Sequence, residues 1–178
     1  MDIDEYRDHV ETKVLDHEYD PLPPAEANPF DPVWYKEDED PTIGRTKVFV
    51  TINDDLELDT ETLETTTESF RTLVGSASPP TDGSFQNLFG YIVYPRSGFD
   101  EALIEFATEE FTVANRRTNV FPLLYDLDAE TLHTHTIPRL KGRGFYEKQK
   151  FDAEKLLTPS SNSVCALWLV AKLISSVL

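Results

Sequence analysis

Two histidines, spaced two residues apart, come closest to the pattern of a metal site. His133 and His135 fall in a stretch, 131–137, whose alternation predicts a β-strand. Side chains two apart in a strand share a face, so both imidazoles could hold one metal ion, with Asp126 or Asp128 across a predicted hairpin as a further ligand. The opposing interpretation is a solvated hairpin face on which polar and apolar side chains simply alternate.

A basic, glycine-containing segment, Pro-Arg-Leu-Lys-Gly-Arg-Gly, precedes a predicted helix. Helix N-termini expose unpaired N–H groups, and glycine lets an anion approach the backbone. The candidate anion-binding residues are Arg139, Lys141, Gly142, Arg143 and Gly144. A phosphate is the simplest ligand, although the segment matches neither a P-loop nor a dinucleotide fingerprint. The opposing interpretation is that these cations form ion pairs with acidic helices.

Other catalytic chemistry finds little support. There is no Gly-x-Ser-x-Gly turn, and the single cysteine, Cys165, lies in an apolar stretch that disfavours a thiolate. One cysteine also excludes an internal disulfide framework and a cysteine-rich zinc cluster. Carboxylates are too numerous for any pair of them to be informative. We therefore predict no cofactor, with a divalent metal at the histidine pair as the one exception.

The charge is unevenly distributed. The chain of 178 residues carries 33 acidic and 16 basic side chains, a formal net charge of −17. Residues 115–150 hold seven basic and four acidic side chains, which leaves nine basic against 29 acidic in the remainder. Dispersed acidic residues with few lysines are typical of adaptation to a high-salt cytoplasm, where repulsion is screened within about 3 Å at 1 M salt. The alternative is an ordinary acidic protein.

The elements that must position these residues alternate along the chain. Apolar spacing predicts an N-terminal helix over 2–18, then strands over 46–53 and 88–94, each followed by a helix starting at Asp59 or Thr60 and at Asp100. A hairpin over 119–127 and 131–137 and a helix over 145–157 complete the core. Pro122 inside the hairpin indicates an edge or a bulge. This order predicts an α/β or α+β fold, a small mixed sheet of about four strands covered by helices.

The segment from 20 to 45 is rich in proline, holding six of the twelve in the chain. Proline fixes φ and removes a donor, so we expect an extended strap rather than regular structure. Phe30, Trp34 and Tyr35 are expected to dock on the domain, the alternative being that Trp34 and Tyr35 face a partner. The expected organisation is an N-terminal helix over 1–19, the strap over 20–45, an α/β core over 46–157 and a tail over 158–178.

The tail contains no Asp or Glu, and residues 164–174 read VCALWLVAKLI. Three interpretations stay open. It is a core or partner helix, a short membrane contact through 164–178 with Lys172 at its surface, or a stretch altered by truncation or a changed reading frame. A membrane helix needs about 20 apolar residues, and this run is shorter.

Three functions follow from these features. The first is a cytoplasmic, non-catalytic binding or regulatory module that recognises a protein partner or a small anion. Its C-terminal helix would pack on the domain, dock on a partner or anchor the protein to a membrane. The second is a metal-assisted hydrolase or nuclease acting on a phosphoester, with His133, His135 and Asp126 on the metal and the basic segment on phosphate. Nucleic-acid binding through the basic residues alone is least favoured, because the acidic remainder repels polyanions.

Overall fold

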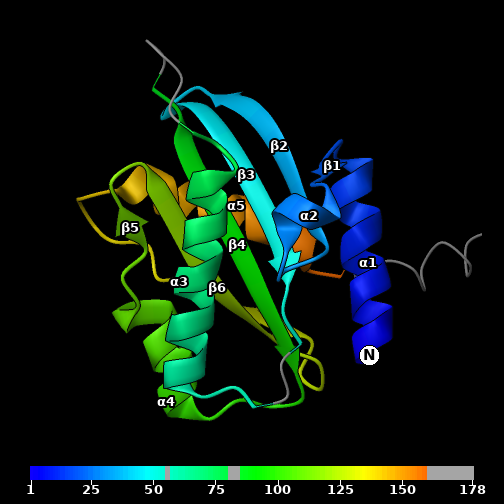
Figure 1. The fold of residues 1–178 in the computed structure, drawn as a ribbon. Coiled ribbons are helices and arrows are strands. Elements are labelled where there is room, and N and C mark those ends of the chain that lie inside the picture. Colours follow the sequence, from blue (N-terminus) through cyan, green and yellow to red (C-terminus); the bar gives the residue numbers. More distant parts are fainter. Residues whose placement is uncertain (55–56, 80–84, 160–178) are drawn as a thin grey trace, which may run out of the picture.

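A computed structural model describes residues 1–54, 57–79 and 85–159, and its strands form one seven-stranded mixed sheet (Figure 1). The helices are α1 (Ile3–Asp16), α2 (Pro24–Ala27), α3 (Thr60–Ser76), α4 (Glu101–Glu105) and α5 (Arg143–Leu157), with a π-helical turn η1 (Phe106–Glu110) after α4. The strands are β1 (Asp20–Pro21), β2 (Val33–Asp40), β3 (Gly44–Ile52), β4 (Asn87–Arg96), β5 (Ala114–Asn115), β6 (Thr118–Asp126) and β7 (Thr131–His133). The strand order is β1-β2-β3-β4-β6-β5, and β7 also pairs with β6.

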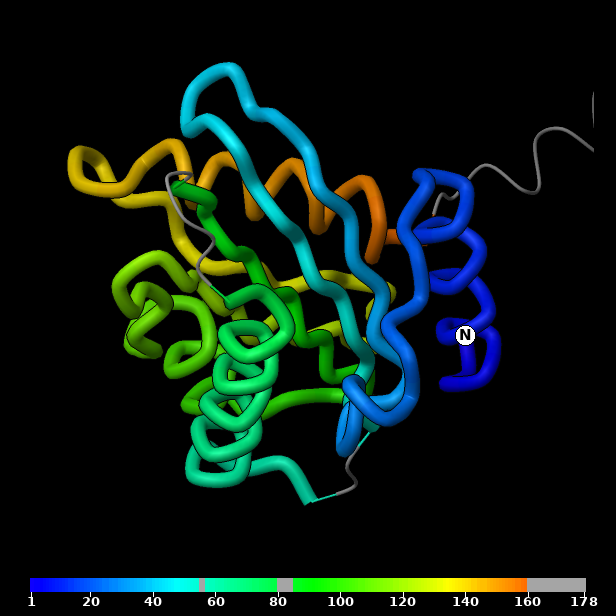
Figure 2. The backbone as a smooth tube through the Cα atoms, turned by 45° about the horizontal axis from the view of Figure 1, so that its top comes forward, coloured from blue at the N-terminus to red at the C-terminus, as the bar shows by residue number. Residues whose placement is uncertain are grey.

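Three parallel strands, β3, β4 and β6, form the centre of the sheet, and helices cover both faces. The crossovers α3 and α4–η1 lie on one face, where Phe70 of α3 packs close to Gly90 of β4. On the other face, α1 stacks Tyr6 on Tyr125, and α5 stacks Phe145 on Phe89. Figures 1 and 2 show the same three layers, with α3 in front of the sheet and α5 behind it.

Local sequence signals set the helix starts as predicted. Asp2 caps α1 within a reciprocal capping box with Glu5, and the Asp59 side chain accepts the backbone N–H of Thr62 at the start of α3. Asp100 caps α4 in the same way. Such caps satisfy N–H groups that the first helical turn leaves without a backbone partner. The helix after Asp100 is short, because α4 ends at Glu105 and gives way to the π-helical turn.

The sheet is larger than the expectation of about four strands. The largest difference is β2, which pairs antiparallel with β3 along its whole length. It lies inside the segment expected to be an irregular strap. Its second half, Glu37–Asp40, is polar on both faces, so the alternation that marks a half-buried strand is missing there. The other additions, β1 and β5, are two residues long, whereas β7 is the predicted second strand of the hairpin, shortened from 131–137 to Thr131–His133.

Pro122 lies in the interior of β6 without breaking the sheet. Val120 donates its N–H to Val113 on the outer edge of β6, and strand alternation points the nitrogen of Pro122 to that same edge. β5 pairs there only with residues 118 and 119, and β7 only with 124–126. Proline therefore occupies the gap between two short edge strands, where its missing N–H costs no ladder bond.

Two of the three aromatic residues expected to dock on the domain, Phe30 and Trp34, are buried, whereas Tyr35 is half-buried. Phe30 is 7 % and Trp34 is 4 % exposed, and the Phe30 ring meets the edge of Phe70 from α3. No helix in the described parts of the chain is long and apolar enough to cross a bilayer. The predicted C-terminal helix and its membrane contact, 164–178, lie outside the described residues.

Candidate functional site

The rings of the two candidate metal ligands, His133 and His135, contact different aromatic side chains. The His133 ring meets Phe99 edge-on, with centroids 6.3 Å apart, whereas the His135 ring meets Phe121 and Tyr146. β7 ends at His133, so the strand geometry that would align the two rings stops before His135. Each imidazole therefore lies in its own aromatic environment.

His135 is a buried ring held by one hydrogen bond. Its Nε2 lies 3.2 Å from the carbonyl oxygen of Phe111, and its Nδ1 has no partner within the described residues. Burial lowers the pKa of His135, so the neutral ring is favoured and Nε2–H is the donor.

Asp126 shapes the turn between β6 and β7. Its Oδ1 accepts the backbone N–H groups of Asp128 and Ala129, and the bond from Ala129 is the main cause of its lowered pKa. His133 lowers the pKa of Asp126 further by its charge, so those two groups are neighbours. Across the described ranges, no three His, Cys, Asp or Glu side chains form a group that could hold a metal ion. The metal site stays a prediction.

The basic segment lies at the amino ends of the parallel strands. Gly144 packs against the β2–β3 turn, where an added Cβ would lie 3.3 Å from Ile43. The carbonyl of Ile43 accepts the side-chain amide of Asn87, the first residue of β4. Next to it, Leu88 donates its N–H to Arg117, which immediately precedes β6. The start of α5 and the β5–β6 turn therefore share one end of the sheet (Figure 1).

This topology brings to one end of the sheet cations that the sequence separates by more than twenty residues. Arg116 and Arg117 lie beside Glu68 and Arg71 of α3, on one face of the sheet, and the segment before α5 lies towards the other face. We call the group Arg116, Arg117, Arg139, Lys141 and Arg143 the amino-end basic surface. Arg116 takes a left-handed backbone conformation with φ of 56° at the tip of the two-residue β5–β6 turn. Left-handed backbone is costly for a side chain other than glycine, Asn or Asp, and such strain is often kept where a residue has a function.

Ion pairing accounts for only one of these five cations. Arg143 Nε lies 2.6 Å from Glu147 Oε1 on the same helix, and Arg117 donates to the carbonyl of Ser78. Arg116, Arg139 and Lys141 make neither a salt bridge nor a hydrogen bond with any residue that the structure describes. The ion-pair interpretation of the segment therefore holds for Arg143 and not for the others.

The backbone at the start of α5 is open as well. Gly142 is the N-cap in the left-handed conformation, with φ of 73°, and no side chain caps this helix. No acidic residue lies in the first turn. The N–H groups and partial positive charge of this helix end directly follow Arg139 and Lys141 in the chain, an arrangement that favours anions.

Sequence reasoning missed a buried charge cluster beneath α5. Lys148 Nζ lies 3.0 Å from Asp152 Oδ2, and the hydroxyl of Tyr91 donates to the same oxygen at 2.8 Å. Burial, and then the charge of Asp152, raise the pKa of Tyr91. The i, i+4 spacing of Lys148 and Asp152 was visible in the sequence, but Tyr91 is 61 residues away and only the fold brings it close.

Beside this cluster runs a trough of about 310 Å³ between β2 and α5. Its lining includes Tyr19, Lys36, Asp38, Asp40, Glu147 and Asp152. It carries both charges, in contrast to the amino-end basic surface.

No protein-family model, curated protein or solved structure matches this chain. Function must therefore be inferred from these sites. The amino-end basic surface offers guanidinium, ammonium and backbone N–H donors, which is a set that binds oxyanions. Lys148, Asp152 and Tyr91 satisfy one another, so as a set they have the form of a structural cluster.

Proposed function

We propose that this protein is a non-catalytic binding module that recognises an anionic ligand, a phosphate group being the simplest, through its amino-end basic surface. The observation that carries this proposal is that Arg116, Arg139 and Lys141 have no acidic partner within the described residues, in a chain with 33 acidic side chains. Cations that only balanced the surface charge would be expected to pair with those carboxylates.

The chemistry of the surface fits a compact oxyanion. Arginine offers a planar, bidentate set of donors that matches phosphate or carboxylate, and the open N–H groups of α5 add uncharged donors. The surrounding acidic surface repels an extended polyanion, so a small anion or a local anionic group on a protein partner is favoured over nucleic acid.

High salt would make short-range contacts decisive. If the protein works in a high-salt cytoplasm, long-range attraction is screened within a few ångströms, about 3 Å at 1 M. Binding would then depend on directional hydrogen bonds from guanidinium and backbone groups, whose strength salt reduces less than that of distant charges. The composition of the chain supports this setting.

Calorimetric titration with inorganic pyrophosphate tests the proposal. The double variant Arg139→Ala/Lys141→Ala removes two donors without changing the glycines of the turn. We expect its affinity to fall by tenfold or more, about the effect of losing one charge-assisted hydrogen bond. Lys13→Ala, which removes a cation from α1, is the matched control and is expected to retain wild-type affinity.

Two results would contradict the proposal. One is the absence of pyrophosphate binding to the wild-type protein at millimolar concentrations. The other is an equal loss of affinity in the double variant and in Lys13→Ala, because it would show only a general response to net charge.

A further inference from the structure

A hollow of about 400 Å³ lies between the carboxyl-terminal half of α3 and the β5–β6 turn. Its lining consists of Glu68, Arg71, Thr72 and Gly75 from α3 and of residues 115–118 from the turn. Apart from Gly75, every lining side chain is polar or charged, and the three arginines and one glutamate give the hollow a net charge of +2. Such a lining suits a small hydrophilic anion better than a ligand with a large apolar part.

Arg71 gives the hollow a fixed wall. It is only 6 % exposed, and its guanidinium donates to the carbonyl oxygens of Thr112 and Val113, which lie just before β5. On its other side, Arg71 Nε lies 3.0 Å from Glu68 Oε2. These bonds tie α3 to the chain that enters the turn, so the hollow keeps its shape without a ligand. A preformed site loses less conformational entropy on binding.

The turn contributes two further guanidinium groups. Arg117 is half-buried and donates to the carbonyl of Ser78, which holds its side chain beside the end of α3. Arg116 is exposed and has no hydrogen-bond or ion-pair partner among the residues that the structure describes. Guanidinium groups bind phosphate through paired, charge-assisted N–H bonds. Arg116 therefore retains donors that an anion in the hollow can use.

Stabilisation of the fold explains only part of this arrangement. It accounts for Arg71 and Glu68, which satisfy each other and hold the turn. Two other lining residues are locally unfavourable: Arg116 takes the left-handed backbone conformation with φ of 56°, and Gly75 lies within a helix. An added Cβ at Gly75 would meet nothing within 4 Å, so packing does not require the glycine. Both unfavourable choices border the same hollow, where they leave space and an unpaired cation.

We propose that this hollow binds a small, hydroxyl-rich phosphate such as a sugar phosphate. The inference rests on the proposed function, because Arg116 and Arg117 belong to the amino-end basic surface, and it adds what the phosphate is attached to. These two guanidinium groups hold the phosphate. Glu68, whose side chain is 49 % exposed, accepts from hydroxyl groups of the ligand, and the side chains of Thr72 and Asn115 offer further hydrogen bonds.

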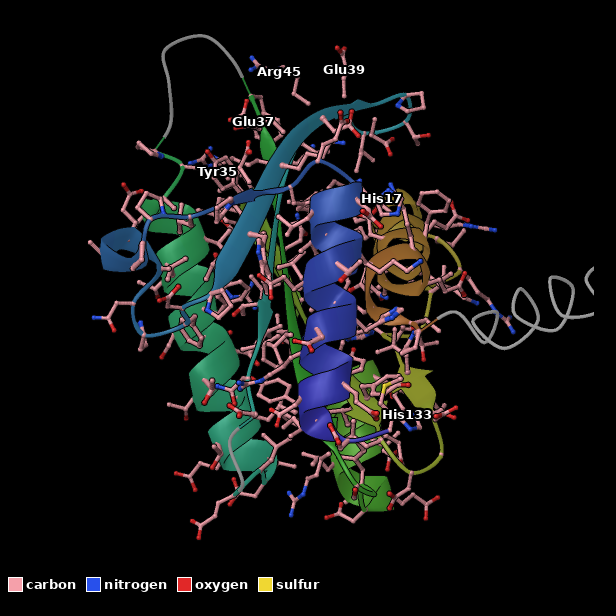
Figure 3. The ribbon with its side chains drawn as sticks, turned by 90° about the vertical axis from the view of Figure 1, so that its right-hand side faces the viewer. His17, Tyr35, Glu37, Glu39, Arg45 and His133 are labelled. Atoms are coloured by element: carbon pink, nitrogen blue, oxygen red, sulfur yellow. The ribbon has the colours of Figure 1, made fainter. Side chains whose placement is uncertain are left out.

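The hollow is distinct from the segment before α5. Figure 3 shows α3 and α5 on opposite sides of the sheet, and Gly144 at the start of α5 packs against the β2–β3 turn. The amino-end basic surface therefore has two parts, one on each face of the sheet. Variants in α3 can test the first part without changing the second.

Calorimetric titrations of the full chain at one KCl concentration test the proposal with ribose 5-phosphate, inorganic phosphate and ribose. We expect ribose 5-phosphate to bind about tenfold more tightly than inorganic phosphate, because bonds to its hydroxyl groups add to those of the phosphate. Ribose alone should not bind measurably. Equal affinities for the two phosphates would overturn the proposal, and so would the absence of ribose 5-phosphate binding at millimolar concentration.

A variant that fills the hollow locates the ligand. Gly75→Gln places a side chain in the hollow without changing any charge, and should abolish the binding of ribose 5-phosphate. Thr65→Gln introduces the same residue at an exposed position of α3 that does not line the hollow, and is the matched control. It should retain wild-type affinity. Equal affinities of the two variants would show that the ligand binds elsewhere.

A charge variant confirms the role of the turn. Arg116→Gly removes the guanidinium, and glycine adopts the left-handed conformation without strain, so the variant should fold and bind ribose 5-phosphate about tenfold more weakly. Lys13→Ala, which also removes one positive charge, should bind as the wild type does. An equal loss in both variants would reduce the effect to net charge and overturn the proposal.

These results separate the inference from the proposed function. If Gly75→Gln retains ribose 5-phosphate while Arg139→Ala/Lys141→Ala loses pyrophosphate, the hollow is not the site and the proposed function stands. If Gly75→Gln loses ribose 5-phosphate while the double variant retains pyrophosphate, the hollow is the site and the segment before α5 does not contribute. If the wild-type protein binds neither compound, both proposals fail.

Discussion

At the scale of single residues, Asp152 concentrates the polar interactions beneath α5. One of its carboxylate oxygens accepts from both Lys148 and Tyr91, and the side chains of the ion pair are 11 % and 8 % exposed. A buried charge is tolerated only when its partners compensate for lost hydration. The cluster therefore fixes α5 on the sheet, and with it the position of the amino-end basic surface.

Removing the hydroxyl that donates to Asp152 should destabilise the fold. We expect Tyr91→Phe to lower the free energy of unfolding by about 1.5–3 kcal/mol, the range for a hydrogen bond to a charged group. Tyr125→Phe removes a buried hydroxyl that has no partner among the described residues, and should change stability by less than about 0.5 kcal/mol. Urea unfolding measures both, and equal effects would show that the bond to Asp152 does not contribute.

Stability should also depend on the protonation of His135. Burial lowers its pKa in the folded state, while in the unfolded chain it titrates near 6.5. The unfolded chain therefore takes up the proton first as the pH falls. The contribution of the neutral ring is complete above the unfolded pKa and is lost as the pH falls through the folded pKa.

The variant His135→Gln isolates this effect. Between pH 7 and pH 5 the free energy of unfolding should fall more for the wild-type protein than for the variant. The carboxylates are present in both proteins, so their contribution cancels in this comparison. Chemical unfolding at several pH values gives the slope of the free energy of unfolding against pH for each protein. Equal slopes would mean that His135 has the same pKa in the folded and the unfolded chain.

At the scale of elements, two glycines have opposite roles in the packing of α3. At Gly90 in β4, an added Cβ would lie 3.0 Å from Val120 and 3.1 Å from Phe70, so the absence of a side chain allows α3 to lie close to the sheet. At Gly75, inside α3, nothing lies within 4 Å of the added atom. The helix continues past Gly75 and ends at Ser76.

Alanine at these two positions should change stability in opposite directions. Gly90→Ala is expected to destabilise the protein by about 1–3 kcal/mol through overpacking. Gly75→Ala is expected to stabilise it by up to about 1 kcal/mol, because alanine favours the helix over the unfolded chain. Thermal unfolding compares them, and a destabilised Gly75→Ala would show that this helix end needs glycine.

The sequence predicted the elements whose signals are local. The caps at Asp59 and Asp100 and the apolar strands β4 and β6 were recognisable, because each depends on residues close in the chain. β2 was missed, because its exposed half lacks alternation and prolines precede it. The basic segment after Pro138 was also recognisable, but that it shares one end of the sheet with Arg116 and Arg117 depends on how β6 lies beside β4. That pairing is a property of the topology.

At the scale of the whole molecule, the net charge of −17 should couple stability to salt. If the chain is adapted to high salt, raising KCl from about 0.1 M to 2 M screens self-repulsion and should increase the free energy of unfolding. Urea unfolding at each KCl concentration measures the trend. A protein that loses stability as KCl rises would not be salt-adapted, whatever its composition.

Although the molecule is acidic overall, we propose that it binds an anion at one basic end of its sheet. A two-dimensional NMR titration of the ¹⁵N-labelled protein with inorganic pyrophosphate tests this binding residue by residue. We expect saturable shifts at the amides of Arg116, Arg117 and the Arg139–Gly144 segment, with Ser97 and Asp126 at the opposite end of the sheet unaffected. Shifts confined to that opposite end, or none at all, would contradict it.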